Sequence, residues 1–320
     1  MKILAIESSC DETACAVVDN GTKVISSVIA SSAAMHEKYG GIVPEVAARE
    51  QLKVIIPTIT EATKNVEYDA IAVTIGPGLI GSLLVGVETA KTMAMVSGKP
   101  IIPVNHVLAH MYANFINNNI IFPAISLVVS GGHTELFLMS SPKDLKWLGG
   151  TLDDAAGEAF DKTARLLGFG SRGGVAIQEA SMRQRVNASA VKLPRPLMYD
   201  KTLNFSFSGL KTAILRAWQK EENHSEEFIA GLAYEVQEAI TDVLVSKTRA
   251  AARHYHANTI MLSGGVSANL RLREKIPEAI APPIPLCTDN AVYIASYAFF
   301  RGTPIDWHTV TAIPDLSVEV

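Results

Sequence analysis

The fold is decided by two stretches of the chain, ILAIESSCDETACAVVD at residues 3–19 and AISLVVSGGHTELFLMS at residues 124–140. Each consists of an apolar segment, a small polar turn and a second apolar segment, which is typical of a β-hairpin with a polar tip. Later in each half, at residues 69–96 and 258–276, an apolar run enters a glycine turn and then a helical pattern. The two halves of the chain therefore repeat one plan.

This repeated plan predicts an α/β fold of two similar lobes with a nucleotide cleft between them. Leu52, Ile55, Ile56 and Ile59 are spaced for one face of a helix, and Pro44 suits the first position of that helix. We expect the first lobe at residues 1–115, joined again by residues 291–320 with a helix at 291–300, and the second at 116–290. Residues 170–204 show weak periodicity, which favours an insertion or a mobile loop.

The composition is that of an ordinary globular protein, because 48% of the 320 residues are apolar. The longest uncharged stretch, residues 70–87, contains five glycine or proline residues and is interpreted as a buried strand, loop and helix rather than a membrane span. The N-terminus has no export signal, and the three cysteines, Cys10, Cys15 and Cys287, do not pair fully. These features predict a cytoplasmic protein without membrane contact.

A formal charge of −4 argues against binding of nucleic acid by the whole surface. One local candidate lies between residues 181 and 220, where eight basic residues accompany a single acid, Asp200. The basic residues are Arg183, Arg185, Lys192, Arg195, Lys201, Lys211, Arg216 and Lys220. A solvated surface with scattered charges explains this segment equally well.

Glycine-rich turns are the first candidates for chemistry, because their backbone N–H groups can approach a phosphate without a Cβ in the way. A single glycine pair is usually an ordinary tight turn. Here four such turns are distributed over the repeated plan, which favours nucleotide binding. They are Val128, Val129, Ser130, Gly131 and Gly132; residues 76–81; Gly173 with Gly174; and Gly264 with Gly265.

His106 and His110 are four residues apart, so on a helix both imidazoles project from one face and can share a metal ion. Two unrelated histidines are the commoner explanation of this spacing. A metal site needs a third ligand, and Asp289 is the best candidate for a two-histidine, one-carboxylate set with open positions. A zinc peptidase is disfavoured because Val107 stands where its helical glutamate base would follow.

Four further polar residues have two interpretations each. Asp11 and Glu12, at the tip of the first hairpin, either take part in proton transfer or cation binding, or form an ordinary polar turn. Asp161 either accepts hydrogen bonds from a ribose or is a favourable charge in the first turns of a helix. Asn269 either caps the helix that follows it or contacts a nucleoside through its amide.

Taken in order, nine motifs resemble the bacterial TsaD proteins, relatives of the archaeal and eukaryotic Kae-type proteins. They are ESSCDET, GGIVPEVAAR, GPGLIGSLLVG, NHVLAH, VSGGHTEL, TLDDAAGEAFDK, NFSFSGLKT, GGVSAN and LCTDN. The resemblance covers nearly the whole chain. It implies an actin/Hsp70/sugar-kinase-like fold and transfer of a threonylcarbamoyl group from threonylcarbamoyl-AMP to N6 of the adenosine at tRNA position 37.

The resemblance also implies roles for individual residues. His106, His110 and Asp289 would bind one Fe(2+) or Zn(2+), whereas residues 128–132, Asp161, Gly174 and Asn269 would hold the adenylate. TsaB-type and TsaE-type proteins would be partners, tRNA the acceptor, and a TsaC-type enzyme the source of the adenylate. The chain departs from the family pattern at residues 171–175, SRGGV, and in a shorter interval between Asn269 and Asp289.

Three alternatives remain on sequence grounds. An ATP-dependent kinase or ATPase of the same fold would bind ATP or ADP at the glycine turns, but it would not need His106 beside His110. A non-catalytic scaffold subunit of the TsaB type would not retain both histidines and Asp289. A metallopeptidase is the least favoured, because the glutamate base is absent.

Overall fold

The computed structural model describes residues 1–36, 39, 41–170, 173–183 and 191–319 of the chain. It consists of two compact units. The first unit contains Met1–Ile120, Pro142–Asp144 and Pro282–Val320, and the second contains Ile121–Ser141 and Leu145–Ala281.

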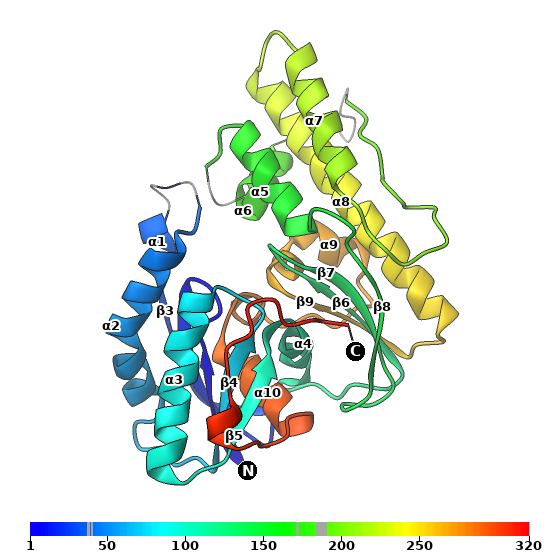
Figure 1. The fold of residues 1–320 in the computed structure, drawn as a ribbon. Coiled ribbons are helices and arrows are strands. Elements are labelled where there is room, and N and C mark those ends of the chain that lie inside the picture. Colours follow the sequence, from blue (N-terminus) through cyan, green and yellow to red (C-terminus); the bar gives the residue numbers. More distant parts are fainter. Residues whose placement is uncertain (37–38, 40, 171–172, 184–190, 320) are drawn as a thin grey trace. The chain divides into compact units, whose positions relative to one another are not determined.

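The first unit is built on a mixed five-stranded sheet in the order β3-β2-β1-β4-β5 (Figure 1). Its strands are β1 (Lys2–Glu7), β2 (Glu12–Asp19), β3 (Lys23–Ser31), β4 (Ala70–Gly76) and β5 (Ile101–Asn105). β1, β2 and β3 pair in antiparallel fashion, whereas β4 is parallel to β1 and to β5. The hairpin predicted for residues 3–19 is thereby confirmed.

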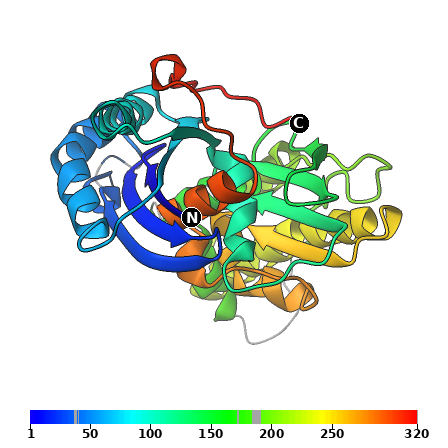
Figure 2. The same ribbon diagram turned by 90° about the horizontal axis from the view of Figure 1, so that it is seen from below.

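Helices lie on both faces of this sheet, as Figure 2 shows from below. α2 (Pro44–Ala62) and α3 (Ile80–Ser97) pack against each other on one face, and α10 (Ala291–Phe300) lies on the other, beside α4 (His106–His110). The shorter helices are α1 (Ala33–His36), η2 (Met111–Phe115), η4 (Ile284–Leu286) and η5 (Trp307–Thr309). The uncharged stretch at residues 70–87 forms β4 and the first turns of α3, as expected.

α2 begins at Pro44 as predicted, but only half of its predicted apolar face is buried. Ile55 and Ile59 pack into the core, whereas Leu52 and Ile56 are 64% and 59% exposed. The four residues lie on one helix as predicted, but that face is only partly covered. Leu52 and Ile56 form one row of apolar residues along the helix, and Ile55 and Ile59 form the next. The spacing alone does not show which of the two rows packs on the sheet.

The second unit contains a four-stranded sheet in the order β8-β7-β6-β9. Its strands are β6 (Ala124–Val129), β7 (Thr134–Met139), β8 (Leu145–Gly150) and β9 (Thr259–Ser263). β6, β7 and β8 pair in antiparallel fashion and β9 runs parallel to β6. This sheet repeats the order and direction of β3-β2-β1-β4, which confirms the repeated plan.

The helices of the second unit are α5 (Ala156–Leu166), α6 (Gly173–Met182), α7 (Ser208–Lys220), α8 (Glu226–His254), η3 (Gly265–Ala268) and α9 (Leu270–Lys275). α8 packs on β6 and β9 and contributes most of its apolar residues to the core. α6 corrects the expectation of a loop throughout residues 170–204. Its buried residues include Gly173, Ala180 and Ser181. Because these residues are small or polar, the sequence shows no helical repeat of large apolar side chains here. Residues 171–172 and 184–190 of that segment lie outside the described residues.

Within the described part of the chain, none of the helices combines the length and the apolar character that crossing a membrane requires.

Candidate functional site

The site in the first unit begins at Glu7, the last residue of β1, which is completely buried. Its Oε1 accepts the N–H of Ser9 at 2.6 Å, and its Oε2 accepts the hydroxyl of Thr74 at 2.5 Å. The same Oε2 lies 3.0 Å from Nδ1 of His106. Burial acts to raise the pKa of Glu7, but the charge and hydrogen bond of His106 outweigh it and lower that pKa. Glu7 is therefore a buried carboxylate held by three donors.

The three predicted metal ligands lie together. α4 follows β5 directly, and Asn105 begins it by accepting the N–H groups of Val107 and Leu108. The Nε2 atoms of His106 and His110 each lie 3.5 Å from Oδ1 of Asp289, which comes from the segment before α10. One ligand atom from each residue lies within 4.8 Å of the others, so one ion could contact all three.

Burial and the neighbouring charges shift the pKa values of these three residues. Burial disfavours a charged His106, but the carboxylates of Glu7 and Asp289 outweigh it and raise the pKa of His106. Burial lowers the pKa of His110 and acts to raise that of Asp289, which the two histidines nevertheless hold low. Because Glu7 can accept the Nδ1 proton of His106, we assign Nε2 as the atom free to bind a metal. Two imidazoles and a carboxylate match the ligands that Fe(2+) and Zn(2+) take in proteins.

Asp11 and Glu12 lie in the same unit, at the end of the β1–β2 hairpin. The Gln51 amide on α2 fixes this turn by donating to the carbonyls of Cys10 and Glu12, each at 3.0 Å, with Ser8 O at 3.4 Å. Burial, followed by the hydrogen bond and charge of Asp11, raises the pKa of Glu12, and the Asp289 charge adds to this effect. This shift disfavours the ionised form of Glu12, which makes it the weaker candidate for a base.

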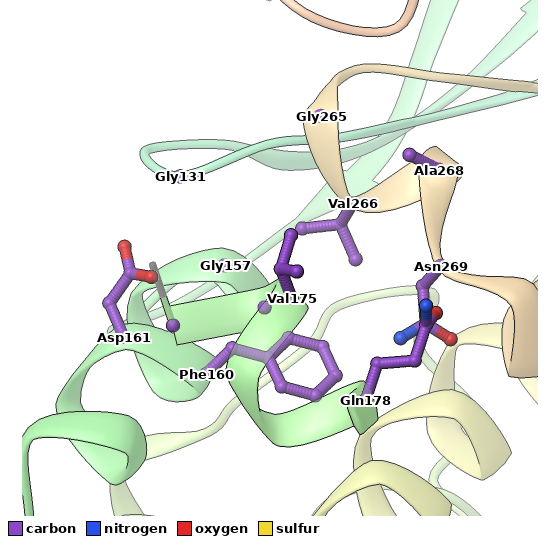
Figure 3. A pocket seen from close by; sticks show the side chains of 12 residues that line it. Gly131, Gly157, Phe160, Asp161, Val175, Gln178, Gly265, Val266, Ala268 and Asn269 are labelled. Carbon is purple, nitrogen blue, oxygen red and sulfur yellow. The ribbon is translucent and has the colours of Figure 1, made fainter. Parts of the chain in front are cut away.

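The second unit contains a pocket of about 320 Å³, shown in Figure 3. Four of the predicted substrate-binding residues, Gly131, Asp161, Gly174 and Asn269, line it. The other lining residues are Gly157, Phe160, Gly173, Val175, Gln178, Gly265, Val266 and Ala268. Val128 and Val129 do not line it, because their side chains are fully buried in β6. Its volume falls in the range of small-ligand sites, about 300–1,000 Å³.

The β6–β7 turn packs directly on the start of α5. Ser130 O accepts the N–H of Gly157 at 3.2 Å, and the hydroxyl of Thr134 accepts the N–H of Ala156 at 2.9 Å. A Cβ at residue 157 would lie 2.4 Å from Ser130 O, so only glycine allows this approach. Gly131 and Gly132 face open space. A glycine turn beside the N-terminus of an 11-residue helix is an environment that favours an anion.

The opposite end of the pocket carries amides. Figure 3 shows Phe160, Val175 and Val266 between Asp161 on one side and Gln178 and Asn269 on the other. Asn269 caps α9 by accepting the N–H of Leu272 at 3.0 Å, and its Nδ2 donates to Gln237. The capping interpretation of Asn269 is therefore correct, while the residue also lines the pocket.

Sequence reasoning missed Glu7 and Tyr293 in the first unit and the apolar pocket residues Phe160, Val175 and Val266 in the second. The Tyr293 hydroxyl lies 3.4 Å from His110 Nε2 and 3.5 Å from Asp289 Oδ1. A signal existed for Glu7, because it directly follows the wholly apolar run at residues 3–6, where a carboxylate that folds into the interior is unusual. The three apolar residues resemble any other core positions in the sequence.

Comparison with known proteins identifies the family. The family model described as "TsaD: tRNA N6-adenosine threonylcarbamoyltransferase" matches residues 23–296. The chain belongs to this family. Membership makes it a transferase of tRNA N6-threonylcarbamoyladenosine synthesis, as predicted, and the kinase alternative has no stronger support.

Individual members of the family match over nearly their whole length. The tRNA N6-adenosine threonylcarbamoyltransferase of Persephonella marina is 47% identical, with 96% of this chain and 93% of the relative covered. The protein of the same name from Syntrophomonas wolfei is 46% identical, with coverage of 93% and 92%. For the Moorella thermoacetica protein the identity is 44%, with coverage of 98% and 96%.

Solved structures of distant proteins share the fold. Full-length HypF in its phosphate- and nucleotide-bound form aligns with a TM-score of 0.62 at 14% identity, covering 93% of this chain and 46% of HypF. Component A of (R)-2-hydroxyglutaryl-CoA dehydratase from Acidaminococcus fermentans aligns with a TM-score of 0.54 at 14% identity, covering 93% of this chain and 98% of that protein. These matches confirm the predicted actin/Hsp70/sugar-kinase-like α/β fold.

Proposed function

We propose that this chain transfers the threonylcarbamoyl group of threonylcarbamoyl-AMP to N6 of the adenosine at position 37 of tRNA, with a metal ion at His106, His110 and Asp289. The observation that carries the proposal is the convergence of two imidazole nitrogens on one carboxylate oxygen, each at 3.5 Å. A kinase of this fold needs no such set, whereas carbamoyl transfer can use it.

The metal would be one Fe(2+) or Zn(2+). When bound, it supplies Lewis-acid stabilisation of the negative charge that develops on the carbamoyl and phosphate oxygens. Glu7 keeps the His106 ring in the orientation that presents Nε2, and the burial of His110 keeps its imidazole neutral, as a ligand must be.

The adenylate would occupy the pocket of the second unit. Gly131 and Gly132, with the N-terminus of α5, suit its phosphate. Val128, Val129 and Ser130 would act through the backbone by fixing this turn. Asp161 is available to the ribose hydroxyls, and Gly174 and Asn269 line the nucleoside end. An adenine nucleotide such as ATP or ADP would fit the same features.

In the transfer step, the lone pair of the adenosine N6 amine attacks the carbamoyl carbon, and the bond from this carbon to the phosphate oxygen breaks. AMP leaves with the bonding pair, and the amine loses one proton. We assign this proton to Asp11, with Glu12 as a protonated neighbour that donates a hydrogen bond. General-base assistance of this kind contributes about 10²–10⁴-fold.

The proposal extends to partners and organisation. TsaB-type and TsaE-type proteins would complete the active complex in the cytoplasm, and a TsaC-type enzyme would supply the adenylate. Leu52 and Ile56 of α2, with Ile80 and Leu84 of α3, are exposed apolar side chains that a protein partner could cover. The predicted lobes, residues 1–115 with 291–320 and residues 116–290, would correspond to the two compact units with shifted boundaries, since residues 282–290, including Asp289, belong to the first unit.

The test is mass spectrometry of nucleosides from unmodified tRNA incubated with threonylcarbamoyl-AMP, this protein and its partners. A His106→Ala, His110→Ala double variant is compared with the parent, and bound metal is measured in both. We expect threonylcarbamoyladenosine only with the parent, and loss of metal together with product in the variant.

A matched control is His308→Ala, since His308 is an exposed histidine of the same unit whose ring interacts with its neighbours Asp306 and Trp307. Product from the double variant at the parent rate would refute the metal site. No product from the parent, in a mixture that a related transferase can complete, would refute the transfer reaction itself.

A further inference from the structure

A groove between α5 and α7 of the second unit has no role in the proposed chemistry. Its volume is about 390 Å³. One wall is formed by Lys162, Thr163, Arg165 and Leu166 of α5, and the other by Lys211, Thr212, Ile214 and Leu215 of α7. The floor is apolar and three cations lie on its walls, so the groove combines an aliphatic surface with positive charge.

The three cations are not equivalent. Lys162 is neutralised by Asp154 and Glu158, at 2.7 and 2.6 Å. Arg165 and Lys211 are exposed, and neither forms an ion pair with a carboxylate of the described residues. Arg165 Nε donates to the backbone O of Asp161 at 3.4 Å, and its charge also acts on the Asp161 carboxylate. The groove therefore presents two exposed positive charges outside the ion pairs, from facing helices, in a chain whose formal charge is −4.

The groove and the nucleotide pocket share helix α5. Gly157, Phe160 and Asp161 line the pocket, and the next residues, Lys162 and Thr163, begin the wall of the groove. The two sites are thus separated by about one helix diameter, roughly 10 Å. An acceptor adenosine must reach a group held in the pocket, so the phosphates that flank this adenosine pass within a similar distance.

We propose that the α5–α7 groove binds the sugar-phosphate backbone of the tRNA strand beside the modified adenosine, with Arg165 and Lys211 on its phosphates. The inference rests on the proposed function only in taking tRNA as the acceptor. Charge complementarity selects this occupant, since phosphates are what closely spaced, unpaired cations bind in RNA. Thr212, on the same wall, donates its hydroxyl to Ser208 O at 3.3 Å, so its oxygen is left to accept the hydrogen of a 2′-OH.

The structure also separates these cations from others in the basic segment at residues 181–220. Arg195 is held by Glu235 and Asp242 and serves the packing of α8. Arg216 is exposed on α7 but does not line the groove, since five residues place it about 140° around the helix from Lys211. Arg216 is therefore a matched control, and Arg185 lies outside the described residues.

The experiment measures the dissociation constant for unmodified tRNA between 50 and 200 mM salt, for the parent, Lys211→Gln, Arg165→Gln with Lys211→Gln, and Arg216→Gln. Lys211→Gln should weaken binding and reduce the slope of log K against log salt by about 1, and the double variant by about 2. Lys211→Arg should restore the parent slope, and Arg216→Gln should leave it unchanged.

The adenylate affinity of Lys211→Gln should equal that of the parent, because Lys211 does not line the nucleotide pocket. An equal affinity shows that the second unit is still folded. An unchanged salt slope in the double variant overturns the proposal. If the variants bind tRNA as the parent does but no longer bind a partner protein, the proposal is also overturned, and the groove is a binding site for an acidic protein. Binding does not require turnover, so failure of the transfer reaction would be recognised separately.

Discussion

The Nδ1 atom of His106 lies 3.0 Å from Oε2 of Glu7, although 99 residues separate the two in the chain. β1 and β5 both flank β4 in the first sheet, so the residues that end or follow them meet at the same edge. This contact determines which imidazole nitrogen of His106 faces Asp289 and His110. It supports the metal site without contributing a ligand.

Replacement of Glu7 by Gln should weaken metal binding by about 10–100-fold, which is the usual effect of losing such a supporting carboxylate. Gln has nearly the same shape but no charge to hold the His106 proton. The measurement is metal affinity by competition with a chelator, with Glu88→Gln on the exposed side of α3 as control. Parent-like affinity of Glu7→Gln would show that Glu7 serves only folding.

Asp11→Asn should slow turnover by about 10²–10⁴-fold while adenylate affinity stays near the parent value. Glu12→Gln should slow it far less at neutral pH, because burial and Asp11 raise the pKa of Glu12 and so disfavour its ionised form. A cation bound at Asp289 would reduce only the Asp289 contribution to the pKa of Glu12, while burial and Asp11 would still raise that pKa. Single-turnover rates for both variants check the prediction, and a Glu12→Gln effect as large as that of Asp11→Asn would contradict it.

Gly157→Ala should abolish tight adenylate binding, since its Cβ would lie 2.4 Å from Ser130 O and would push the β6–β7 turn away from α5. Gly209→Ala is the matched control on α7, where a Cβ would meet nothing within 4 Å. Calorimetry of nucleotide binding distinguishes the two. Equal affinities would mean that the turn does not hold the phosphate.

Asp153→Asn should lower the free energy of unfolding at pH 7 by about 1 kcal/mol, because the amide keeps an acceptor oxygen but loses the charge that strengthens its hydrogen bonds. Its carboxylate accepts the N–H groups of Phe207 and Ser208, at 2.7 and 3.2 Å, where α7 begins. Burial acts to raise its pKa, but these bonds and the Ser206 hydroxyl outweigh burial and lower it.

Because the pKa of Asp153 is lower in the folded state, its contribution is present above about pH 4 and is lost as the pH falls through the folded value. The stability difference between parent and variant should therefore shrink below about pH 4. Urea titrations at pH 7 and pH 3 measure this difference, with the exposed Asp315→Asn as control. A difference that stays constant between the two pH values would argue against the ionised cap.

The sequence predicted local features well because the signals for them are local. The hairpins at residues 3–19 and 124–140 follow from apolar segments around polar tips, and His106 and His110 share a helix face because they are four residues apart. Glu7 was missed because its partner, His106, is 99 residues away in the sequence. The exposure of Leu52 and Ile56 could not be predicted, because it depends on which row of α2 the sheet covers.

Other parts of the site depend on packing that no short motif encodes. The pocket side chains Phe160, Val175 and Val266 come from α5, α6 and η3, and their convergence is a property of the second unit as a whole. Asn269 could be predicted as a cap or as a pocket residue, and the structure assigns it the cap while leaving it in the pocket wall.

The Gln51 amide ties α2 to the turn that carries Asp11 and Glu12, and its two hydrogens are shared among three carbonyl oxygens. We therefore expect the helix and the turn to move together. A protein that binds the outer side of α2, where Leu52 and Ile56 are exposed, would change the position of Asp11 and Glu12 through a single glutamine side chain.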